Sequence, residues 1–451
     1  MAKYQKYAEY KDSGVEWLEN VPREWDIIKI KHLSTVKRGA SPRPIDDPKY
    51  FDDNGEYAWV RIADVSASDM YLLNTTQTMS DLGSSLSVKL EPNQLFLSIA
   101  GTVGKPCINK IKACIHDGFV YFPELKIPNK YLFYVFAGEQ AYKGLGKMGT
   151  QLNLNTDTVG DIKVALPKSQ SDIYKIIEFL DHETTKIDHL IEKQQQLIEL
   201  LKEKRQAVIS HAVTKGLDPN VPMKDSGVEW LGKVPEHWNM APVRRYLVEH
   251  RQGYYTTESY VDEGLKLLRI TDLRDLGEIN ISNCPMVNES DTTHLFKLQK
   301  GDVVFARTGG AGSFGVITED YENLIYASYL IRFRFMNKIF EPDYLRFLFQ
   351  SDSFQLSVKQ NIHGGVNQNI HAEDIKNTVI CAPSLSEQKE IIEYLENQCL
   401  LFENLIYKAS YSVKLMQERR TALISAAVTG KIDVRNWQAS TVAEADTELS
   451  A

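Results

Sequence analysis

The stretch Asp12-Ser-Gly-Val-Glu-Trp-Leu18, which runs on to Val21-Pro22 and Trp25, occurs a second time as Asp225-Ser-Gly-Val-Glu-Trp-Leu231, followed by Val234-Pro235 and Trp238. The two copies are separated by 225 − 12 = 213 residues. A solenoid repeat has about 20 to 50 residues, so this period is far too long for one. The repeat therefore indicates a duplicated half-molecule.

A second repeated segment follows each copy at a distance. Ile176-Ile-Glu-Phe-Leu180 is matched by Ile391-Ile-Glu-Tyr-Leu395, an offset of 391 − 176 = 215, and the match continues to about residues 214 and 429. The inserts between these repeats agree only at scattered positions, such as Trp59-Val-Arg-Ile-Ala-Asp64 and Leu267-Leu-Arg-Ile-Thr-Asp272. We predict one repeated frame that carries two α+β domains of the same fold with diverged surfaces.

Each of the later repeats has a hydrophobic period of 3.5 residues, which is typical of a coiled coil. The first seam consists of Ile173, Ile177, Leu180, Thr184, Ile187, Ile191, Gln194, Ile198, Leu201, Arg205, Val208 and Ala212, and the second keeps the register 215 residues later. Each helix of about 40 residues would be roughly 60 Å long. The other copy is the obvious partner for each stripe, although each stripe could instead pack on its own domain.

These patterns predict an α+β protein with two globular domains separated by two long antiparallel coiled-coil helices, related by a pseudo-twofold internal repeat. The expected boundaries are an N-terminal repeated segment at 1–25, a first domain at 26–166, a central region with a long helix at 167–238, a second domain at 239–382, a C-terminal helix at 383–436 and a disordered tail at 437–451.

The composition predicts an ordinary globular protein of the cytoplasm. Hydrophobic residues make up 43% and charged residues 25% of the chain, which is typical of globular domains. We find no run of 18 apolar residues that could span a membrane, and the first residues lack the apolar core of a signal peptide. The five cysteines form no Cys-x-x-Cys pair, which disfavours a disulfide framework or a zinc site.

The net charge of −8 is unlike the basic balance of most DNA-binding proteins. Residues 26–166 contain 16 Lys and Arg against 15 Asp and Glu, and residues 239–382 contain 15 against 18. Neither insert is basic overall. Contacts to DNA would therefore depend on local clusters of arginine and lysine, or on a partner that supplies part of the positive surface.

Glycine-rich segments do not match nucleotide-binding motifs. Gly101-Thr-Val-Gly104-Lys105 lacks the phosphate-loop pattern, because Ile99 and Pro106 stand where glycine and a hydroxyl residue are required. It predicts a tight turn, and the segment Gly309–Gly315 predicts a loop. Without a metal-ligand or nucleophile pattern, we assign no catalytic residue and no metal ligand, and we expect a protein that is not an enzyme.

Residues suited to DNA contact occur in both inserts. Arginine and lysine can bind phosphates or guanine, and asparagine and glutamine can bind adenine edges. The same side chains can instead cap turns or remain solvated. The candidates are Arg38, Arg43, Lys105, Lys147, Gln151, Asn153, Asn155, Arg251, Arg269, Arg274, Arg307, Asn367, Gln368 and Asn369.

The repeated Asp-Ser-Gly-Val-Glu-Trp-Leu and Val-Pro-x-x-Trp motifs, the segment Gly301-Asp-Val-Val-Phe-Ala-Arg-Thr-Gly309 and the Ile-Ile-x-x-Leu helices resemble the specificity (S) subunit of type I restriction-modification systems. The resemblance extends over about residues 10–436, and both halves carry it. The first insert departs from it at Pro92-Asn-Gln-Leu95, where the second has Gly301-Asp-Val-Val304.

This resemblance implies that two target recognition domains each read one half of a bipartite, asymmetric site in double-stranded DNA. It implies that the helices set the spacing and dock two methyltransferase (M) subunits, which restriction (R) subunits join. S-adenosylmethionine, ATP and Mg would be held by those partners, and the S subunit would have no catalytic activity or cofactor of its own. Two alternatives remain open: a stand-alone or decoy DNA-binding protein of a mobile element, and a metal-dependent nuclease.

Overall fold

The computed structural model describes residues 4–142, 154–310, 312–336, 338–360 and 369–439. The chain forms two compact units, 1–194 with 411–451 and 195–410. Each unit contains one globular domain and one half of each long helix. The predicted boundaries at 25, 166, 238, 382 and 436 follow a different division and stay a prediction.

The domain of the first unit begins and ends with paired strands, because β3 (Asp26–Lys29) lies antiparallel to β13 (Lys163–Leu166). A five-stranded sheet has the order β4 (Lys37–Arg38), β12 (Phe119–Tyr121), β9 (Leu95–Ser98), β10 (Pro106–Asn109), β6 (Tyr71–Leu72). A four-stranded sheet has the order β7 (Thr78–Met79), β5 (Tyr57–Val60), β11 (Ala113–Ile115), β8 (Val88–Leu90). The helices are α1 (Ile30–Leu33), η1 (Pro48–Tyr50), α2 (Ile62–Ala67), α3 (Asp81–Ser85), α4 (Asn129–Ala137), η2 (Gln140–Tyr142) and α5 (Thr156–Asp161).

The domain of the second unit repeats this plan. Its outer strands β16 (Asn239–Pro242) and β24 (Val379–Ala382) pair antiparallel. One sheet has the order β17 (Leu247–Gln252), β23 (Leu330–Phe335), β20 (Asp302–Ala306), β21 (Phe314–Val316), and the other β19 (Met286–Val287), β18 (Leu265–Leu268), β22 (Leu324–Tyr326). The helices are η3 (Val243–Tyr246), η4 (Ile270–Asp272), η5 (Asp275–Gly277), η6 (Thr293–Phe296), α7 (Pro342–Gln350), α8 (Asp352–Gln360) and α9 (Ala372–Asn377).

The two domains correspond strand by strand at their centres. The parallel pair β5 and β11 of the first matches the parallel pair β18 and β22 of the second. These strands are largely buried, so their apolar side chains form the inner part of each domain. The predicted α+β class and the internal repeat are confirmed.

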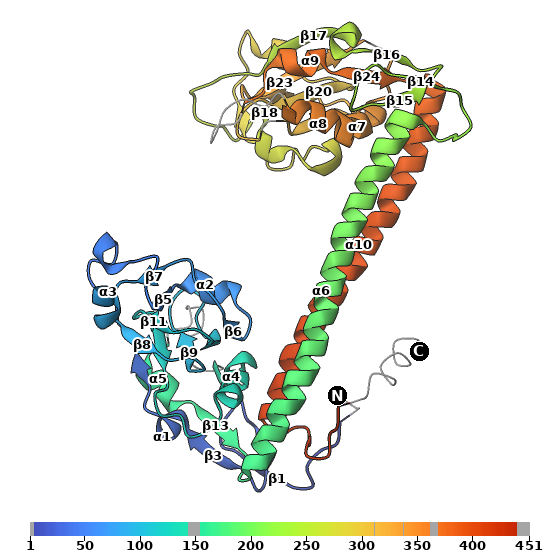
Figure 1. Cartoon of the computed structure of the whole chain (residues 1–451). Coiled ribbons are helices and arrows are strands. Elements are labelled where there is room, and N and C mark those ends of the chain that lie inside the picture. The colour runs from blue at the N-terminus through green and yellow to red at the C-terminus, as the bar shows by residue number, and fades with distance from the viewer. Residues whose placement is uncertain (1–3, 143–153, 311, 337, 361–368, 440–451) are drawn as a thin grey trace. The chain divides into compact units, whose positions relative to one another are not determined.

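The long helices are α6 (Gln170–Lys215) and α10 (Leu385–Val428), shown side by side in Figure 1. In the first unit, Leu180 of α6 shares a hydrophobic core with Ala427 near the end of α10. In the second unit, Val213 near the end of α6 shares a core with Ile391 near the start of α10. The early half of each helix therefore lies against the late half of the other, and the antiparallel arrangement is confirmed.

The predicted seam is also confirmed, since every one of its positions is buried or half-buried. Arg420, a polar seam residue, forms an ion pair with Asp188 across the helices, with 2.7 Å between Nε and Oδ1. The stripe of α6 also packs on its own domain, because Ile177 and Leu180 share a hydrophobic core with residues of α4, and Tyr134 of α4 donates a hydrogen bond to Asp181 of α6 at 2.7 Å. Both packing modes considered for the apolar stripes therefore occur together.

The repeated connectors form hairpins that contact the ends of the long helices. The hairpin β1 (Tyr10–Asp12) and β2 (Asn20–Pro22) lies at the end of α10, where the Tyr10 hydroxyl donates to the Gly430 carbonyl at 3.1 Å. The hairpin β14 (Met223–Asp225) and β15 (Lys233–Pro235) lies at the end of α6, where Lys215 Nζ donates to the Leu231 carbonyl at 2.8 Å. The first connector therefore pairs a backbone carbonyl just beyond α10, and the second connector is held by the side chain of the last residue of α6.

Three smaller expectations concern turns, the tail and membranes. Gly101–Lys105 forms the predicted turn, because it links the antiparallel strands β9 and β10.

At the start of the predicted tail, Trp437 packs edge-on against Phe179, with ring centroids 5.3 Å apart. Residues 440–451 of the predicted tail lie outside the described residues. In the described part of the chain, none of the helices combines the length and apolar character needed to cross a membrane.

Candidate nucleic-acid interface

A cleft of about 670 Å³ lies in the first domain where the loop after β4 passes the ends of β5 and β11. We call it the first cleft. Its lining includes Phe51, Trp59, Arg61, Gln77, His116 and Asp117. The loop is pressed against the neighbouring backbone, because a Cβ atom on Gly39 would lie 2.2 Å from the His116 carbonyl oxygen. Only glycine fits at such a close approach of two backbones.

Among the described residues, no carboxylate contacts the guanidinium of Arg61, which lines the first cleft. The Arg61 backbone N–H donates to Asp64 Oδ2 at 2.8 Å, which fixes the start of α2. The Arg61 guanidinium is exposed and donates to the Gln77 side-chain oxygen. Gln77 is neutral, so the positive charge of Arg61 persists at the mouth of the cleft.

The opposite side of the first cleft is formed by His116 and Asp117. Burial lowers the pKa of His116 against the opposing effect of Asp117, so the ring is neutral at pH 7. The Gly118 N–H donates to His116 Nδ1 at 2.8 Å, which leaves the ring proton on Nε2. The cleft therefore presents a neutral imidazole beside the indole of Trp59, with ring centroids 5.7 Å apart.

Two predicted DNA-contact residues meet at the rim of the first cleft. Arg38 Nε donates to the Asp117 carbonyl at 2.5 Å, and Arg43 Nη2 lies 3.4 Å from the Asp117 carboxylate. The Arg43 side chain is 82% exposed, so its contact with Asp117 is a weak surface pair that phosphates could replace. The structure thus gathers Arg38 and Arg43, which the sequence placed in one loop, around a single residue, because Arg38 contacts the backbone carbonyl of Asp117 and Arg43 contacts its carboxylate.

A second cleft, of about 440 Å³, lies at the corresponding place in the other domain. Its lining includes Tyr254, Tyr255, Tyr260, Arg269, Ser328 and Tyr329. A Cβ atom on Gly253 would lie 2.1 Å from the Ala327 carbonyl oxygen, the same close approach as at Gly39. Tyr255, Tyr260 and Tyr329 are exposed, and aromatic faces of this kind can stack on bases.

Arg269 lies in the second cleft but is held by its own domain. Asp272 accepts from Arg269 Nε and Nη2 at 3.1 Å each, and the Asn283 carbonyl accepts from Nη2 at 3.0 Å. Burial by itself would raise the pKa of Asp272, but the hydrogen bonds from Arg269 outweigh it and lower the pKa. Arg269 is therefore held by contacts within its own domain, and its candidate role in DNA contact stays a prediction.

A third cleft, of about 960 Å³, lies in the second unit between the domain and the long helices. Its lining includes Arg205, Arg274, Gln355, Lys359 and Glu403. The predicted residue Arg274 is exposed there and donates from Nη1 to the Thr271 carbonyl at 2.8 Å. This cleft combines basic and acidic groups, so its charge alone does not favour an anion.

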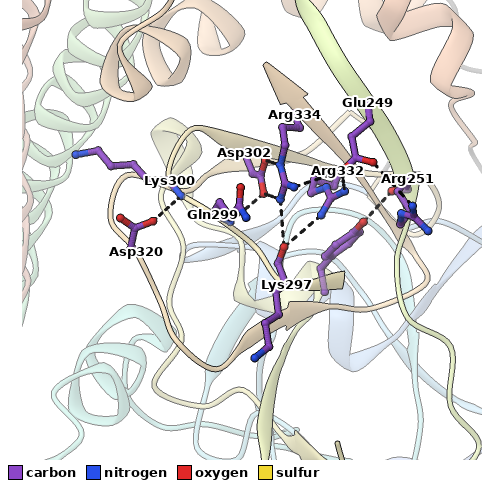
Figure 2. A network of polar contacts seen from close by, with 10 residues as sticks. Glu249, Arg251, Lys297, Gln299, Lys300, Asp302, Asp320, Arg332 and Arg334 are labelled. Atoms are coloured by element: carbon purple, nitrogen blue, oxygen red, sulfur yellow. Dashed lines mark hydrogen bonds and ion pairs between the residues drawn. The ribbon is translucent and has the colours of Figure 1, made fainter. Parts of the chain in front are cut away.

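Arg251 lies beside a buried ionic network that crosses β17, β20 and β23 (Figure 2). Arg334 binds Asp302 through two contacts, 2.8 Å from Nε to Oδ1 and 2.7 Å from Nη2 to Oδ2. Arg332 pairs with Glu249 and donates from Nη1 to the Lys297 carbonyl at 3.2 Å. The network ties three strands together and gives Asp302 of the Gly-Asp-Val-Val motif a structural role.

Arg251 itself contributes little to the network. Its Nη2 lies 3.8 Å from Glu249 Oε2, and its carbonyl accepts from the Tyr326 hydroxyl at 3.1 Å. Its Nε is buried and has no hydrogen-bond partner among the described residues. Arg251 thus stays a predicted candidate for DNA contact.

The remaining predicted residues are dispersed. Lys105 Nζ donates to the Ser66 carbonyl at 2.8 Å, and the Asn155 side chain accepts from two backbone N–H groups at the start of α5, which is the capping role considered for it. Arg307 and Asn369 lie close together, because Ile370 N–H donates to the Arg307 carbonyl at 3.0 Å. Five predicted residues lie outside the described residues: Lys147, Gln151, Asn153, Asn367 and Gln368.

Sequence reasoning missed Arg61, Gln77, His116 and the tyrosines of the second cleft. A signal for Arg61 was present, because it occupies the position in Trp59–Asp64 that Arg269 occupies in Leu267–Asp272. His116 and Gln77 carry no such signal, because His116 directly follows β11 and Gln77 directly precedes β7, and both are distant from Arg61 in sequence. In the described ranges, no three His, Cys, Asp or Glu side chains gather into a metal-binding group.

Comparison with known proteins identifies the family. The type I restriction modification DNA specificity domain matches residues 22–199 and 266–404. The MjaVIII specificity subunit of Methanocaldococcus jannaschii is 22% identical over 92% of this chain and 95% of its own length, and the EcoKI specificity subunit of Escherichia coli K12 is 26% identical over 58% and 56%. One similar solved structure is titled "Structural basis underlying complex assembly and conformational transition of the type I R-M system". The match covers 90% of this chain and 98% of the solved chain, with 13% identity and a TM-score of 0.66, which supports the fold. The chain therefore belongs to the type I restriction modification DNA specificity domain family.

Proposed function

We propose that this chain supplies sequence specificity to a type I restriction-modification complex, and that each of its two domains reads one half of a bipartite, asymmetric site in double-stranded DNA. The observation that carries this proposal is the pair of equivalent clefts. Their backbone frames match at Gly39 and Gly253, whereas their lining side chains differ. A common frame with different lining groups suits two domains that bind DNA alike but recognise different bases.

The long helices would set the spacing of the half-sites and dock the methyltransferase subunits. In the second unit, α10 exposes Tyr394, Leu400, Leu401, Leu405 and Tyr407, and α6 exposes Leu197 and Leu200. Exposed apolar side chains that gather along a helix are typical of a protein-binding surface. We expect these residues to contact an M subunit.

Catalysis in such a complex would belong to the partners. The M subunits would hold S-adenosylmethionine, and the R subunits would use ATP and Mg, while this chain acts without a cofactor. The complex would work in the cytoplasm, in contact with the chromosome. Family membership does not favour the decoy alternative, whose signature would be stable binding of the purified chain to DNA without M subunits.

The test is genome-wide detection of N6-methyladenine in the source strain, with and without this gene. We expect deletion to abolish methylation at one split, asymmetric motif. Exchange of residues 239–382 for the corresponding insert of another S subunit should then change only one half of that motif. An unchanged methylome after deletion would contradict the specificity role, and a change in both halves would contradict the assignment of one domain to each half-site.

A further inference from the structure

The first and second clefts place an arginine at the same position of the same frame. Arg61 directly follows β5, and Arg269 directly follows β18. Both donate their backbone N–H to the carboxylate three residues later, at 2.8 Å for Asp64 and 2.9 Å for Asp272. The backbone position of the two arginines is thus fixed in the same way in both domains.

The guanidinium groups differ in what holds them. Asp272 binds the Arg269 guanidinium through two nitrogens, as described above, and Arg269 is only half-exposed. Arg61 is exposed, and the described residues give its guanidinium one hydrogen-bond partner, the oxygen of Gln77. A guanidinium has five N–H donors. Arg61 therefore keeps a pair of adjacent N–H donors for a ligand, whereas most of the N–H donors of Arg269 already form hydrogen bonds within the protein.

The chemistry of the first cleft favours a guanine edge. Guanine offers two acceptors in the major groove, N7 and O6, which match the two parallel donors of a guanidinium. Adenine offers an acceptor beside a donor, so the same guanidinium would leave one group unpaired. Gln77 holds Arg61 without neutralising it, and Arg43 offsets Asp117, one of the two carboxylates, Asp46 and Asp117, that line the cleft.

We propose that Arg61, oriented by Gln77, reads a guanine in the half-site recognised by residues 26–166, and that Arg269 cannot do the equivalent in the other half-site because Asp272 holds it. This inference rests on the proposed function, and it names the residue that determines specificity at one position. Gln77 acts as a positioning residue, since it contacts Arg61.

The first experiment determines the methylation motif of strains that express Arg61→Ala. We expect one guanine of the first half-site to become degenerate, with discrimination at that position falling about 10- to 100-fold. Exchange of residues 26–166 identifies which half is the first. The matched control is Arg23→Ala, because Arg23 is 70% exposed and paired with Glu9 at 2.7 Å in the connector, outside both clefts; its motif should be unchanged.

A second control is Arg269→Ala. Because the hydrogen bonds between Arg269 and Asp272 stabilise the local structure, the variant should lower the unfolding temperature. It should not relax the base specificity at any position of the methylation motif. Relaxation at one guanine of the second half-site in a folded Arg269→Ala protein would overturn the contrast between the two arginines.

A measurement on the DNA needs no protein variant. In the assembled complex with M subunits, replacing the proposed guanine by 7-deazaguanine removes the N7 acceptor, and wild-type binding should fall about tenfold, the lower end of the range for a good base contact. The Arg61→Ala complex should be insensitive to the replacement. Three outcomes would refute the assignment of Arg61 to a guanine while leaving the specificity role intact. They are a first half-site without guanine, an unchanged methylation motif for Arg61→Ala, and equal sensitivity of both complexes to 7-deazaguanine. Loss of the specificity role itself would appear differently, as wild-type methylation that follows no split motif.

Discussion

Asp302→Asn should destabilise the second domain, because it removes one charge from the buried network in Figure 2. The Asp302 side chain is 1% exposed and binds Arg334, which is 22% exposed, through two contacts of 2.7 and 2.8 Å. The neighbouring Arg332 is 1% exposed and depends on Glu249. The substitution would leave two arginines, Arg332 and Arg334, with one carboxylate, that of Glu249.

Breaking a buried ion pair by removing one partner costs about 3–5 kcal/mol. The lower end applies here, about 3 kcal/mol, because Arg334 is partly exposed and asparagine keeps an acceptor for the Gln299 N–H that now binds Asp302 at 2.9 Å. Since each 1.4 kcal/mol is a factor of ten, amides that exchange through opening of this domain should exchange about 100-fold faster.

Hydrogen exchange followed by mass spectrometry measures this effect strand by strand. Protection should fall in β20 and β23 and stay unchanged in β9 of the other domain. Combining Asp302→Asn with Arg334→Met removes both charges and should restore at least about half of the lost free energy. A matched control is Gln94→Ala, since Gln94 accepts from the Glu91 N–H at 3.0 Å as Asp302 does from Gln299, but carries no charge.

A loss below about 1 kcal/mol for Asp302→Asn would refute the reasoning, because that is the size of an exposed pair. A double variant that is less stable than the single one would also contradict it. That outcome would mean that the geometry of Arg334, and not its unpaired charge, determines the stability of the sheet.

Three further predictions concern helix ends, helix register and thiols. Gly430→Ala should lower the thermal unfolding temperature more than Gly216→Ala does, although both glycines have positive φ. The new Cβ atom would lie 2.3 Å from the Pro22 ring at position 430 but no nearer than 3.4 Å to a neighbouring atom at position 216. Equal losses would argue against the clash. Removing four residues from α6 between 187 and 205 shortens it by about 6 Å and rotates the seam by about 40°, so assembly with M subunits should fail or the spacer in the methylation motif should change, whereas unchanged yield and spacing would exclude the helix as a ruler. All five cysteines are buried and free, and burial raises the pKa of Cys107 and Cys381 to about 12, so a thiol reagent at pH 8 should label five sites in denaturant and none in the native protein within the same time.

The sequence by itself determined the duplicated frame and the long helices. Repeats such as 12–18 and 225–231 are visible without any structure, and a 3.5-residue period can be read along a single helix because neighbouring seam residues are neighbours in sequence. The same pattern identified the other copy as the partner of each stripe, and the antiparallel direction was an expectation that the structure confirmed, with Leu180 and Ala427 in one core and Val213 and Ile391 in another.

The tertiary structure alone decided which candidate residues share a site. Arg61 and Arg269 occupy equivalent positions in similar sequences, yet one guanidinium contacts Gln77 and the other contacts Asp272. Sequence spacing does not distinguish them, because Asp64 stands three residues after Arg61 just as Asp272 stands after Arg269. The difference is that Gln77, from the segment just before β7, contacts the Arg61 guanidinium, whereas the Arg269 guanidinium is held by Asp272 of the turn that follows it.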